Sequence, residues 1–444
     1  MKHKRKIITI AAVLAVLQAA AQNPQTGLSL REAIDMALKK NADIANADIE
    51  RQKTAFKLKE TRSRLYPQVT GFSSLNYYYA IPKMVIPGEI FGQTGPIPVE
   101  IGTTYDWSSG FRASQLLYNQ SYLTSLKAAK QMEAIGELSL QQQKEEIIYQ
   151  VSRVYYLCQS TRNQIMQLQK SWENMERLSK IARLQSENGT IRKVDYAKVL
   201  VNQNNLQTEI DNLKRLREEQ MALLKYLMGI EMDRVIALSD SLEPSVETHP
   251  LGTPAFTNRT ELKLIDAQKE TAFLSQKAER ESYLPSLSLV SQLYFQGQRN
   301  EFDFFESGEE KFFKTGFVGL NLSVPLFNGL EKRHKSSQYD LSLKQLENQR
   351  INMIRYFSKA YDDAIRQYDN NVNALQRQEE NIRVAEENYE ASLQGYRHQT
   401  ASLADLLLSE NSLIEARLSY YNALLQLKNA ELDVKKARGE LSDY

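Results

Sequence analysis

Two stretches of this chain alternate apolar and polar residues and then run directly into very long proline-free segments. The first covers residues 105–118, and the second covers residues 315–327. An alternation with a period of two is typical of a strand with one apolar and one polar face. The segments that follow, 119–187 and 329–397, are each predicted to form one helix about 100 Å long. Strands that lead into helices of this length are unusual in a single soluble domain.

The order of predicted elements occurs twice, which indicates an internal repeat with a period of about 200 residues. Each half is predicted to contain a helix that ends before a proline, two strands joined by a loop, a long helix and a return helix. The matched landmarks are Thr54-Ala55-Phe56 with Thr271-Ala272-Phe273, Pro67 with Pro285, Tyr118-Asn119 with Phe327-Asn328, Thr190 with Thr400, and Asp195 with Asp405. We therefore predict a first repeat over residues 22–228, a linker over 229–257 and a second repeat over 258–444.

Local signals place several of the boundaries. Ser29 and Glu32 have the spacing of a capping box, and the helix that they start is expected to break near Asn41. Asn188-Gly189 predicts a left-handed turn after the first long helix. Residues 80–103 are rich in proline and glycine and are expected to form a long loop. The other predicted elements are helices 30–64, 190–228, 259–282 and 402–438, strands 69–79 and 287–295, and an acidic, Phe-rich loop over 297–313.

The N-terminal 21 residues resemble a secretory signal. Four basic residues precede the apolar run 7–17, and Ala19-Ala20-Ala21 follows it, so cleavage is predicted before Gln22. A membrane anchor is the alternative, but this apolar run is too short to span a bilayer. Without these 21 residues the chain carries 52 basic residues, which is 56 less 4, and all 54 acidic residues. This near balance of charge does not indicate nucleic-acid binding.

Four amphipathic strands cannot close a barrel by themselves. A strand edge that faces lipid leaves backbone groups without hydrogen-bond partners, so strands in a membrane require oligomerisation. A dimer supplies eight strands and a trimer twelve, with Tyr77–Tyr79, Tyr105 and Trp107 as candidates for an interfacial girdle. The alternative is a small soluble sheet with one covered face. The helices are polar on more than one side, which favours a hollow cylinder of helices over a solid bundle.

Five segments in order carry a resemblance to a known family. They are LSLREAIDMALKKN (28–41), RLYPQ (64–68), YLPSL (283–287), VPLFNG (324–329) and GYRHQTASLADLL (395–407). Together they resemble the TolC family of outer-membrane efflux proteins. The resemblance implies a mainly α fold with β, in which long antiparallel helices form an α-helical barrel and four strands per chain contribute to a trimeric 12-stranded transmembrane β-barrel.

The same resemblance implies a function and its partners. The expected protein is a homotrimeric, passive exit duct in the outer membrane of a Gram-negative-type cell, in contact with outer-membrane lipid. Its helical tunnel is expected to meet a periplasmic adaptor and an inner-membrane transporter. No cofactor, metal or nucleic acid is expected. The exported substrate cannot be read from the sequence.

The resemblance also places candidate residues at the two helix-hairpin tips. Asp195, Asp405 and Tyr396 are expected to form and close the periplasmic aperture. Helix capping is the alternative role for the aspartates, because Ser402 and Asp405 have capping-box spacing. Residues of the turns are expected to contact the adaptor, with plain solvated turns as the alternative: Asn188, Gly189, Thr190, Gln399, Thr400 and Ala401. Ala401 and Leu408 replace an arginine and an aspartate of the family's best-known tip, so a salt-bridge latch at Ala401 is excluded.

No pattern in the sequence indicates an enzyme. The chain lacks a zinc-protease motif, a nucleophile elbow, a phosphate-binding loop and a cysteine pair, and its one cysteine is Cys158. Two non-catalytic alternatives are a periplasmic adaptor and a soluble coiled-coil envelope protein. An adaptor is expected to carry a Gly-rich lipoyl-like β module, and a coiled coil to carry sustained heptads.

Overall fold

The computed structural model describes residues 27–92, 94–244, 256–306 and 312–441, and the predicted signal over 1–21 lies outside them. The chain divides into two compact units. Unit 1 comprises Met1–Glu50, Glu137–Leu264 and Arg350–Tyr444, and unit 2 comprises Arg51–Gly136 and Ile265–Gln349. Each unit therefore draws on both of the predicted repeats, whose boundaries stay a prediction.

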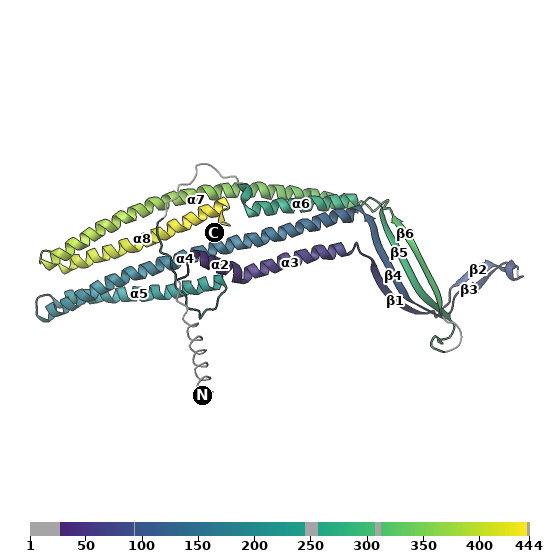
Figure 1. Cartoon of the computed structure of the whole chain (residues 1–444), viewed down its shortest axis with the longest axis horizontal. Coiled ribbons are helices and arrows are strands. Elements are labelled where there is room, and N and C mark those ends of the chain that lie inside the picture. The colour runs from purple at the N-terminus through teal and green to yellow at the C-terminus, as the bar shows by residue number, and fades with distance from the viewer. Residues whose placement is uncertain (1–26, 93, 245–255, 307–311, 442–444) are drawn as a thin grey trace, which may run out of the picture. The chain divides into compact units, whose positions relative to one another are not determined.

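The helices lie close to their predicted positions (Figure 1). They are α2 (Leu30–Lys40), α3 (Ala42–Ser63), α4 (Gln120–Glu187), α5 (Lys193–Met228), α6 (Thr260–Glu281), α7 (Glu331–Arg397) and α8 (Leu403–Arg438), with short 3-10 turns at Gly88–Phe91 and Phe256–Asn258. α4 has 68 residues and α7 has 67. The return helix α5 begins at Lys193, three residues later than predicted, because Thr190 belongs to the preceding turn.

The predicted break near Asn41 is confirmed, and side-chain hydrogen bonds explain it. The Asn41 side chain donates to the carbonyl of Leu227 at 2.8 Å and accepts from the backbone N–H of Asp43 at 2.8 Å. One buried amide thus ends α2, starts α3 and ties both to the end of α5. The capping box of Ser29 and Glu32 at the start of α2 is also present.

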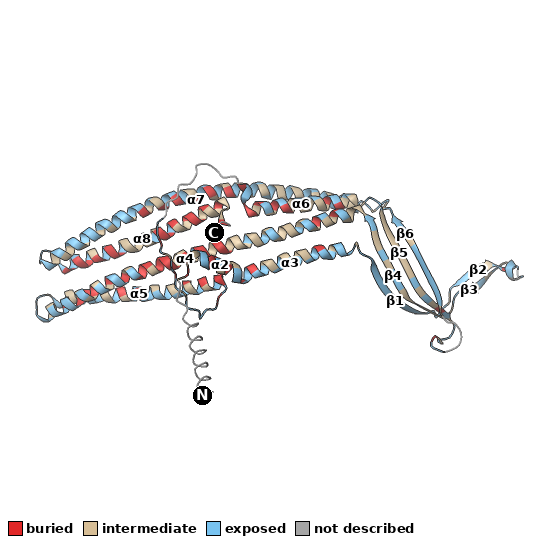
Figure 2. Cartoon of the chain, in the orientation of Figure 1, coloured by how far each residue is buried: buried red, intermediate tan, exposed pale blue. Residues whose placement is uncertain are grey.

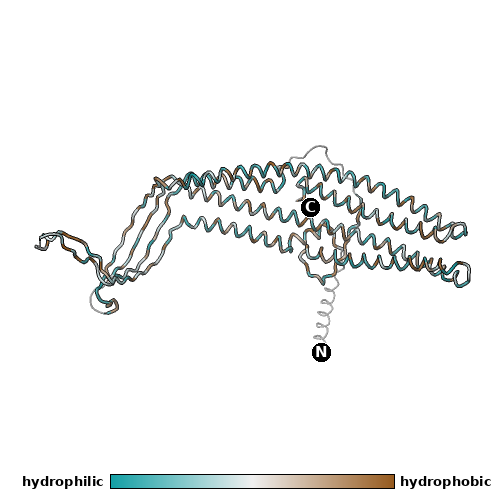
Figure 3. Tube along the Cα trace, turned by 180° about the vertical axis from the view of Figure 1, so that it is seen from behind, coloured by the Kyte–Doolittle hydropathy of each residue, from teal (hydrophilic) through white to brown (hydrophobic). Residues whose placement is uncertain are grey.

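Unit 1 has its apolar core along the facing sides of its helices. One cluster joins α2, α4 and the end of α5 around Tyr155 and Met228, both fully buried. A second joins α7 and α8 around Tyr361 and Leu427. Buried residues follow stripes on these helices, while the outer sides are exposed (Figure 2). Polar and apolar residues alternate along the same helices (Figure 3). The described part of the predicted linker joins this core, because Leu238 pairs with Leu28 in a β-bridge.

Unit 2 contains the predicted strands as one antiparallel sheet. The strands are β1 (Gln68–Tyr77), β4 (Tyr105–Asn119), β5 (Ser286–Arg299) and β6 (Phe313–Ser323), in the order β1-β4-β5-β6. β6 ends at Ser323 rather than at 327, because Pro325 has no N–H to donate to a ladder. Gly329 and Leu330 then take positive φ values of 61° and 65° just before α7. β5 extends to Arg299, into the predicted loop over 297–313.

The prediction of a long loop over 80–103 is wrong. This segment contains a hairpin of β2 (Lys83–Pro87) and β3 (Pro96–Glu100). Prolines are tolerated because both strands of a two-stranded ribbon are edges, where a missing N–H costs no ladder bond. Of the glycines that suggested a loop, Gly88, Gly92 and Gly95 lie between the two strands, and Gly102 follows β3.

The register of the large sheet confirms one apolar and one polar face. Leu75, Trp107 and Gly297 lie opposite one another on one face, and the same face continues to Val318 and Leu320. Val318 is 73% exposed and Leu320 is 67% exposed. Within the described part of the chain, this apolar sheet face is therefore left largely uncovered.

Two glycines with positive φ, Gly229 and Gly189, differ in how closely another element approaches them. Gly229 ends α5 with φ +63°, and a Cβ there would lie 2.3 Å from the carbonyl oxygen of Lys40. Gly189 has φ +73° and nothing within 4 Å. Both substitutions to alanine bear a left-handed backbone cost of roughly 1–2 kcal/mol, but only Gly229→Ala also forces α2 and α5 apart.

We expect Gly229→Ala to lower the melting temperature clearly more than Gly189→Ala, measured by circular dichroism at 222 nm. Equal melting temperatures for the two variants would contradict the close approach of Gly229 to Lys40.

Candidate functional site

The two hairpin tips, residues 188–193 and 394–401, turn by the same hydrogen bonds. The N–H of Thr190 donates to the carbonyl of Gln185 at 2.8 Å, and the N–H of Thr400 donates to that of Gly395 at 2.8 Å. The residue before each threonine has positive φ, 73° at Gly189 and 60° at Gln399. This is the Schellman pattern at a helix end. The left-handed turn predicted from Asn188-Gly189 is confirmed, and the second tip repeats its geometry.

The two hairpins pack against each other close to their tips. The cluster between them is apolar and contains residues of all four helices, and it lies within unit 1. Its buried members are Leu168, Met175, Ala182, Val199, Leu206, Ile210, Leu403, Leu407 and Ile414. The α4–α5 and α7–α8 tips are therefore held as one packed body rather than as two separate hairpins.

Tyr396 links the two tips. Its hydroxyl donates to Oε1 of Gln185 at 3.0 Å, which joins α7 to the end of α4. Burial raises the pKa of Tyr396, and the negative charge of Asp195 raises it further. The phenol thus remains a hydrogen-bond donor at neutral pH. The structure brings Tyr396 into the electrostatic neighbourhood of Asp195, and their role at an aperture stays a prediction.

Asp195 has basic partners that the sequence analysis did not identify. Arg192 Nε lies 2.9 Å from Asp195 Oδ2, and Lys198 Nζ lies 3.4 Å from Oδ1. The hydrogen bond from Arg192 is the largest cause that lowers the pKa of Asp195. With two bases around one carboxylate, the local charge at this tip is net positive.

Asp405 has a different environment. Its Oδ2 accepts hydrogen bonds from the Ser402 hydroxyl at 2.7 Å and from the Ser402 N–H at 3.1 Å. The Ser402 hydroxyl is the largest cause that lowers the pKa of Asp405. The capping box at the start of α8 is therefore present. Among the described residues, no basic side chain lies within salt-bridge distance of Asp405, so its negative charge is not neutralised locally.

An apolar groove runs between α5 and α8 behind the tips. Its volume is about 530 Å³, and its lining is Val194, Ala197, Lys198, Val201, Asn202, Ala404, Leu407, Leu408 and Asn411. Val194, Val201 and Leu408 are more than half exposed, at 62%, 57% and 68%. The sequence analysis missed this groove. The signal was Leu406-Leu407-Leu408, because three consecutive leucines on a helix cannot all face one core.

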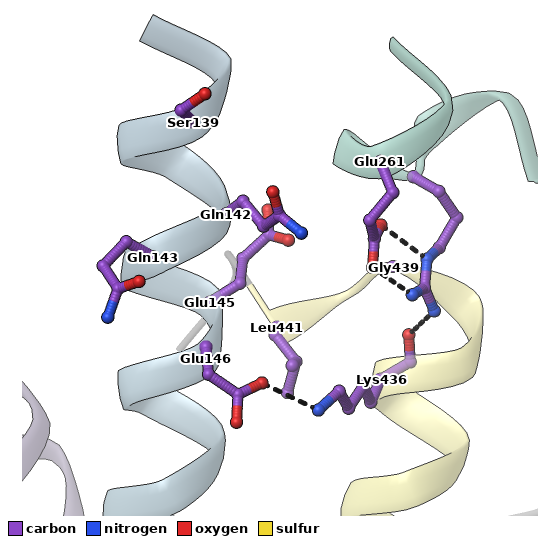
Figure 4. Close-up of a pocket in the computed structure, with 10 residues that line it drawn as sticks. Ser139, Gln142, Gln143, Glu145, Glu146, Glu261, Lys436, Gly439 and Leu441 are labelled. Carbon is purple, nitrogen blue, oxygen red and sulfur yellow. Dashed lines mark hydrogen bonds and ion pairs between the residues drawn. The ribbon is translucent and has the colours of Figure 1, made fainter. Parts of the chain in front are cut away.

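A second pocket in unit 1, of about 310 Å³, is lined by charges that pair with one another (Figure 4). Lys436 Nζ lies 2.9 Å from Glu146 Oε2, and Arg259 Nη2 lies 2.5 Å from Glu261 Oε1. Arg259 also donates to the carbonyl of Lys436. These bonds join α4, α6 and the end of α8, so we assign the pocket to the packing of the helices.

Aromatic residues gather at the end of the sheet where β1 ends and β4 begins. The rings of Tyr77 and Tyr105 lie 5.2 Å apart, and Trp107 lies 5.4 Å from Phe304 and from Phe305. Phe304 is 6% exposed. The indole N–H of Trp107 donates to the Ser73 hydroxyl at 3.0 Å. These rings have the composition of an interfacial girdle.

Three further observations concern membrane crossing, metal binding and the single cysteine. Of the helices that the structure describes, none has the length and hydrophobicity that a membrane crossing requires. The described residues hold no group of three or more His, Cys, Asp or Glu side chains placed for a metal ion. Cys158 is fully buried, and burial raises the pKa of its thiol to about 12, which is the environment of an unreactive thiol.

Comparisons with known proteins agree on one family. Residues 253–440 match the family model for outer membrane efflux protein. The chain is 24% identical to outer membrane protein TolC of Vibrio cholerae serotype O1, over 76% of this chain and 77% of that protein. It is 21% identical to outer membrane protein TolC of Salmonella enteritidis, over 94% of this chain and 82% of that protein.

Solved structures with the same fold are outer-membrane channels. The Campylobacter jejuni CmeC outer membrane channel superposes with a TM-score of 0.75 at 19% identity, covering 93% of this chain and 85% of that chain. The open state of the Neisseria gonorrhoeae MtrE outer membrane channel gives 0.73 at 16% identity, with coverages of 93% and 89%. The match over residues 253–440, the curated relatives and the fold agree, so this chain is similar to the outer membrane efflux proteins of the TolC family.

Proposed function

We propose that this protein is the subunit of a passive exit duct in the outer membrane, part of a tripartite efflux or type I secretion system. The match of residues 253–440 to the outer membrane efflux protein family supports this function. The observation that carries it is the four-stranded sheet, whose apolar face is uncovered and whose two edge strands are unpaired among the described residues. Such a sheet suits lipid on one face and neighbouring copies at both edges.

A homotrimer completes the sheet. Because all neighbouring strands are antiparallel, β1 and β6 run in opposite directions. The β6 edge of one copy therefore matches the β1 edge of the next in an antiparallel pair, and the arrangement is heterologous and closes by rotation. Three copies supply twelve strands for a transmembrane β-barrel, and their long helices supply a periplasmic α-helical barrel.

The duct works without catalysis. A periplasmic adaptor and an inner-membrane transporter supply the substrate and the energy, and outer-membrane lipid surrounds the sheet. The groove of α5 and α8 supports adaptor contact at the tips, because Val194, Val201 and Leu408 are apolar and exposed. The turn residues beside it are Asn188, Gly189, Thr190, Gln399, Thr400 and Ala401.

The aperture is formed by the tips, and the two aspartates contribute differently. Asp195 is compensated by Arg192 and Lys198, whereas Asp405 carries its charge without a basic partner among the described residues. Three copies of Asp405 form a ring of carboxylates, and such a ring favours cations. We therefore assign the cation preference of the aperture mainly to Asp405, and its closure to the Tyr396–Gln185 bond.

The oligomer and its conductance test the proposed function directly. We expect the full-length protein to leave membranes only with detergent, to have the mass of three chains by light scattering, and to give discrete conductance steps in planar lipid bilayers. Release of the protein into buffer without detergent, or a stable monomer that does not conduct, would overturn the proposal.

Asp405→Asn and Ser402→Ala separate the aperture role from helix capping. Ser402→Ala breaks the capping box and keeps the charge, whereas Asp405→Asn removes the charge and keeps an acceptor oxygen. We expect Asp405→Asn to weaken cation preference, measured as the reversal potential in a KCl gradient, and Ser402→Ala to preserve it. The double variant Asp195→Ala with Asp405→Ala is expected to raise conductance as well. Equal reversal potentials for Asp405→Asn and Ser402→Ala would assign Asp405 to capping alone.

The same charge predicts a pH dependence. The lowered pKa of Asp405 keeps the carboxylate ionised down to and below the ordinary Asp pKa of about 3.9, so wild-type cation preference persists to that pH. It is lost as pH falls further through the lowered pKa, because the carboxylate then takes up a proton. Asp405→Asn lacks this transition.

Tyr396→Phe removes the bond between the tips and keeps the ring. A neutral hydrogen bond contributes roughly 0.5–1.5 kcal/mol, so amide exchange at the tips is expected to accelerate by up to about tenfold. Single-channel conductance is expected to rise with it. The matched control is Tyr226→Phe on α5, whose side chain is 63% exposed. If amide exchange at 185–190 and 394–401 is unchanged in Tyr396→Phe, the Tyr396 hydroxyl does not hold the two tips together.

A further inference from the structure

An arginine and two aromatic rings lie together on the polar face of the sheet. Phe72, Gly110 and Tyr294 are directly opposite one another on β1, β4 and β5. Because Gly110 has no side chain, the rings of Phe72 and Tyr294 approach to 6.3 Å across the middle strand. Arg112 follows on the same face of β4, with its guanidinium carbon 5.4 Å from the centre of the Phe72 ring.

The three side chains of this group are open to solvent to different degrees. Arg112 is exposed, while Phe72 and Tyr294 are half-buried. Among the described residues, no carboxylate lies within salt-bridge distance of the Arg112 guanidinium. A guanidinium stacked on an aromatic ring keeps its N–H edge free to bind an anion, because stacking uses only the flat face of the group.

Among the described strand residues of the polar face, Arg112 carries the one positive charge. In the described strands the other charged residue of this face is Asp106, which accepts hydrogen bonds from Gln296 at 2.9 Å and Gln298 at 3.1 Å. Asp106 precedes Arg112 by six positions on one strand, about 20 Å at the rise of an antiparallel strand. That separation exceeds the screening length of about 8–10 Å at physiological ionic strength, so the field at Arg112 stays positive.

We propose that Arg112, Phe72 and Tyr294 form a binding subsite for organic anions that carry an aromatic ring. The acid group of the ligand pairs with the guanidinium edge, and its ring packs against Phe72 and Tyr294. The subsite rests on the proposed duct, in which the polar face of the sheet lines the lumen and three copies repeat the group around it. It deepens that function by assigning one class of cargo that the β-strand part of the duct binds in transit.

The experiment uses two sulfonates that differ by one ring. Benzenesulfonate and methanesulfonate carry the same charge at neutral pH, and each is titrated against the single-channel chloride current of the full-length protein in planar bilayers. We expect benzenesulfonate to block wild type at concentrations about two- to fivefold lower than methanesulfonate, the ratio expected for one exposed aromatic contact. Arg112→Gln is expected to weaken benzenesulfonate block about tenfold and to shift the reversal potential towards cations.

Matched variants separate the charge from the rings. Arg112→Lys is expected to keep the reversal potential near the wild-type value, and Phe72→Leu is expected to abolish the difference between the two sulfonates without changing the reversal potential. Lys314→Gln, which removes a positive charge from the opposite face of the sheet, is the control and is expected to change neither.

The experiment can overturn the duct and the anion subsite separately. A wild-type protein that gives no channels would overturn the duct. If the wild type conducts, and the sulfonates block Arg112→Gln and Phe72→Leu as they block the wild type, the anion subsite is overturned and the duct stands. If Arg112→Gln does not assemble, Phe72→Leu and Arg112→Lys decide the result, because both retain a cation on the face.

Discussion

An open sheet with an uncovered apolar face is the constraint on which the rest of this structure depends. β1 and β6 are its edges, and the outward-pointing N–H and C=O groups of both lack sheet partners within the described chain. In lipid each unsatisfied group costs several kcal/mol, and in water the exposed Val318 and Leu320 face is an aggregation hazard. Association of several copies in a membrane removes both costs together, and this is the physical argument for the proposed trimer.

The helices of unit 1 are joined by polar as well as apolar contacts. Gln159 on α4 is 1% exposed and donates to the carbonyl of Asp240 at 2.7 Å, and Gln164 donates to Asn422 on α8 at 2.8 Å. Buried amides of this kind specify one register, because sliding one helix past another leaves them unpaired. In the proposed helical barrel, helices with water on one side have only narrow apolar stripes, and directional hydrogen bonds would replace part of the missing core.

The features that the sequence predicted correctly are those with a local cause. Alternation of apolar and polar residues predicted the four strands of the large sheet. Capping-box spacing predicted the helix starts at Ser29 and Ser402, and the tolerance of glycine for a left-handed backbone predicted the turn at Gly189. The wrong prediction, a loop over 80–103, came from prolines whose meaning depends on whether a strand is an edge. Arg192 lies only three residues before Asp195, at the N-cap of α5, and the sequence analysis did not identify this local ion pair. The grouping of Phe72, Arg112 and Tyr294 required the register of three strands, which no local pattern contains.

The two proposed charged sites suit a passive duct because both are weak. A passage without an energy source has to attract cargo and release it, so a subsite that binds tightly would block the flow. Arg112 is exposed and stacked rather than enclosed, and an exposed cation–π contact contributes only about 0.5–1 kcal/mol. Asp405 is likewise solvent-accessible, so its field is screened over about 8–10 Å. In the proposed duct, carboxylates at the tips and guanidinium groups in the sheet would bias which ions and ring-bearing anions enter, and the transporter would decide the direction of transport.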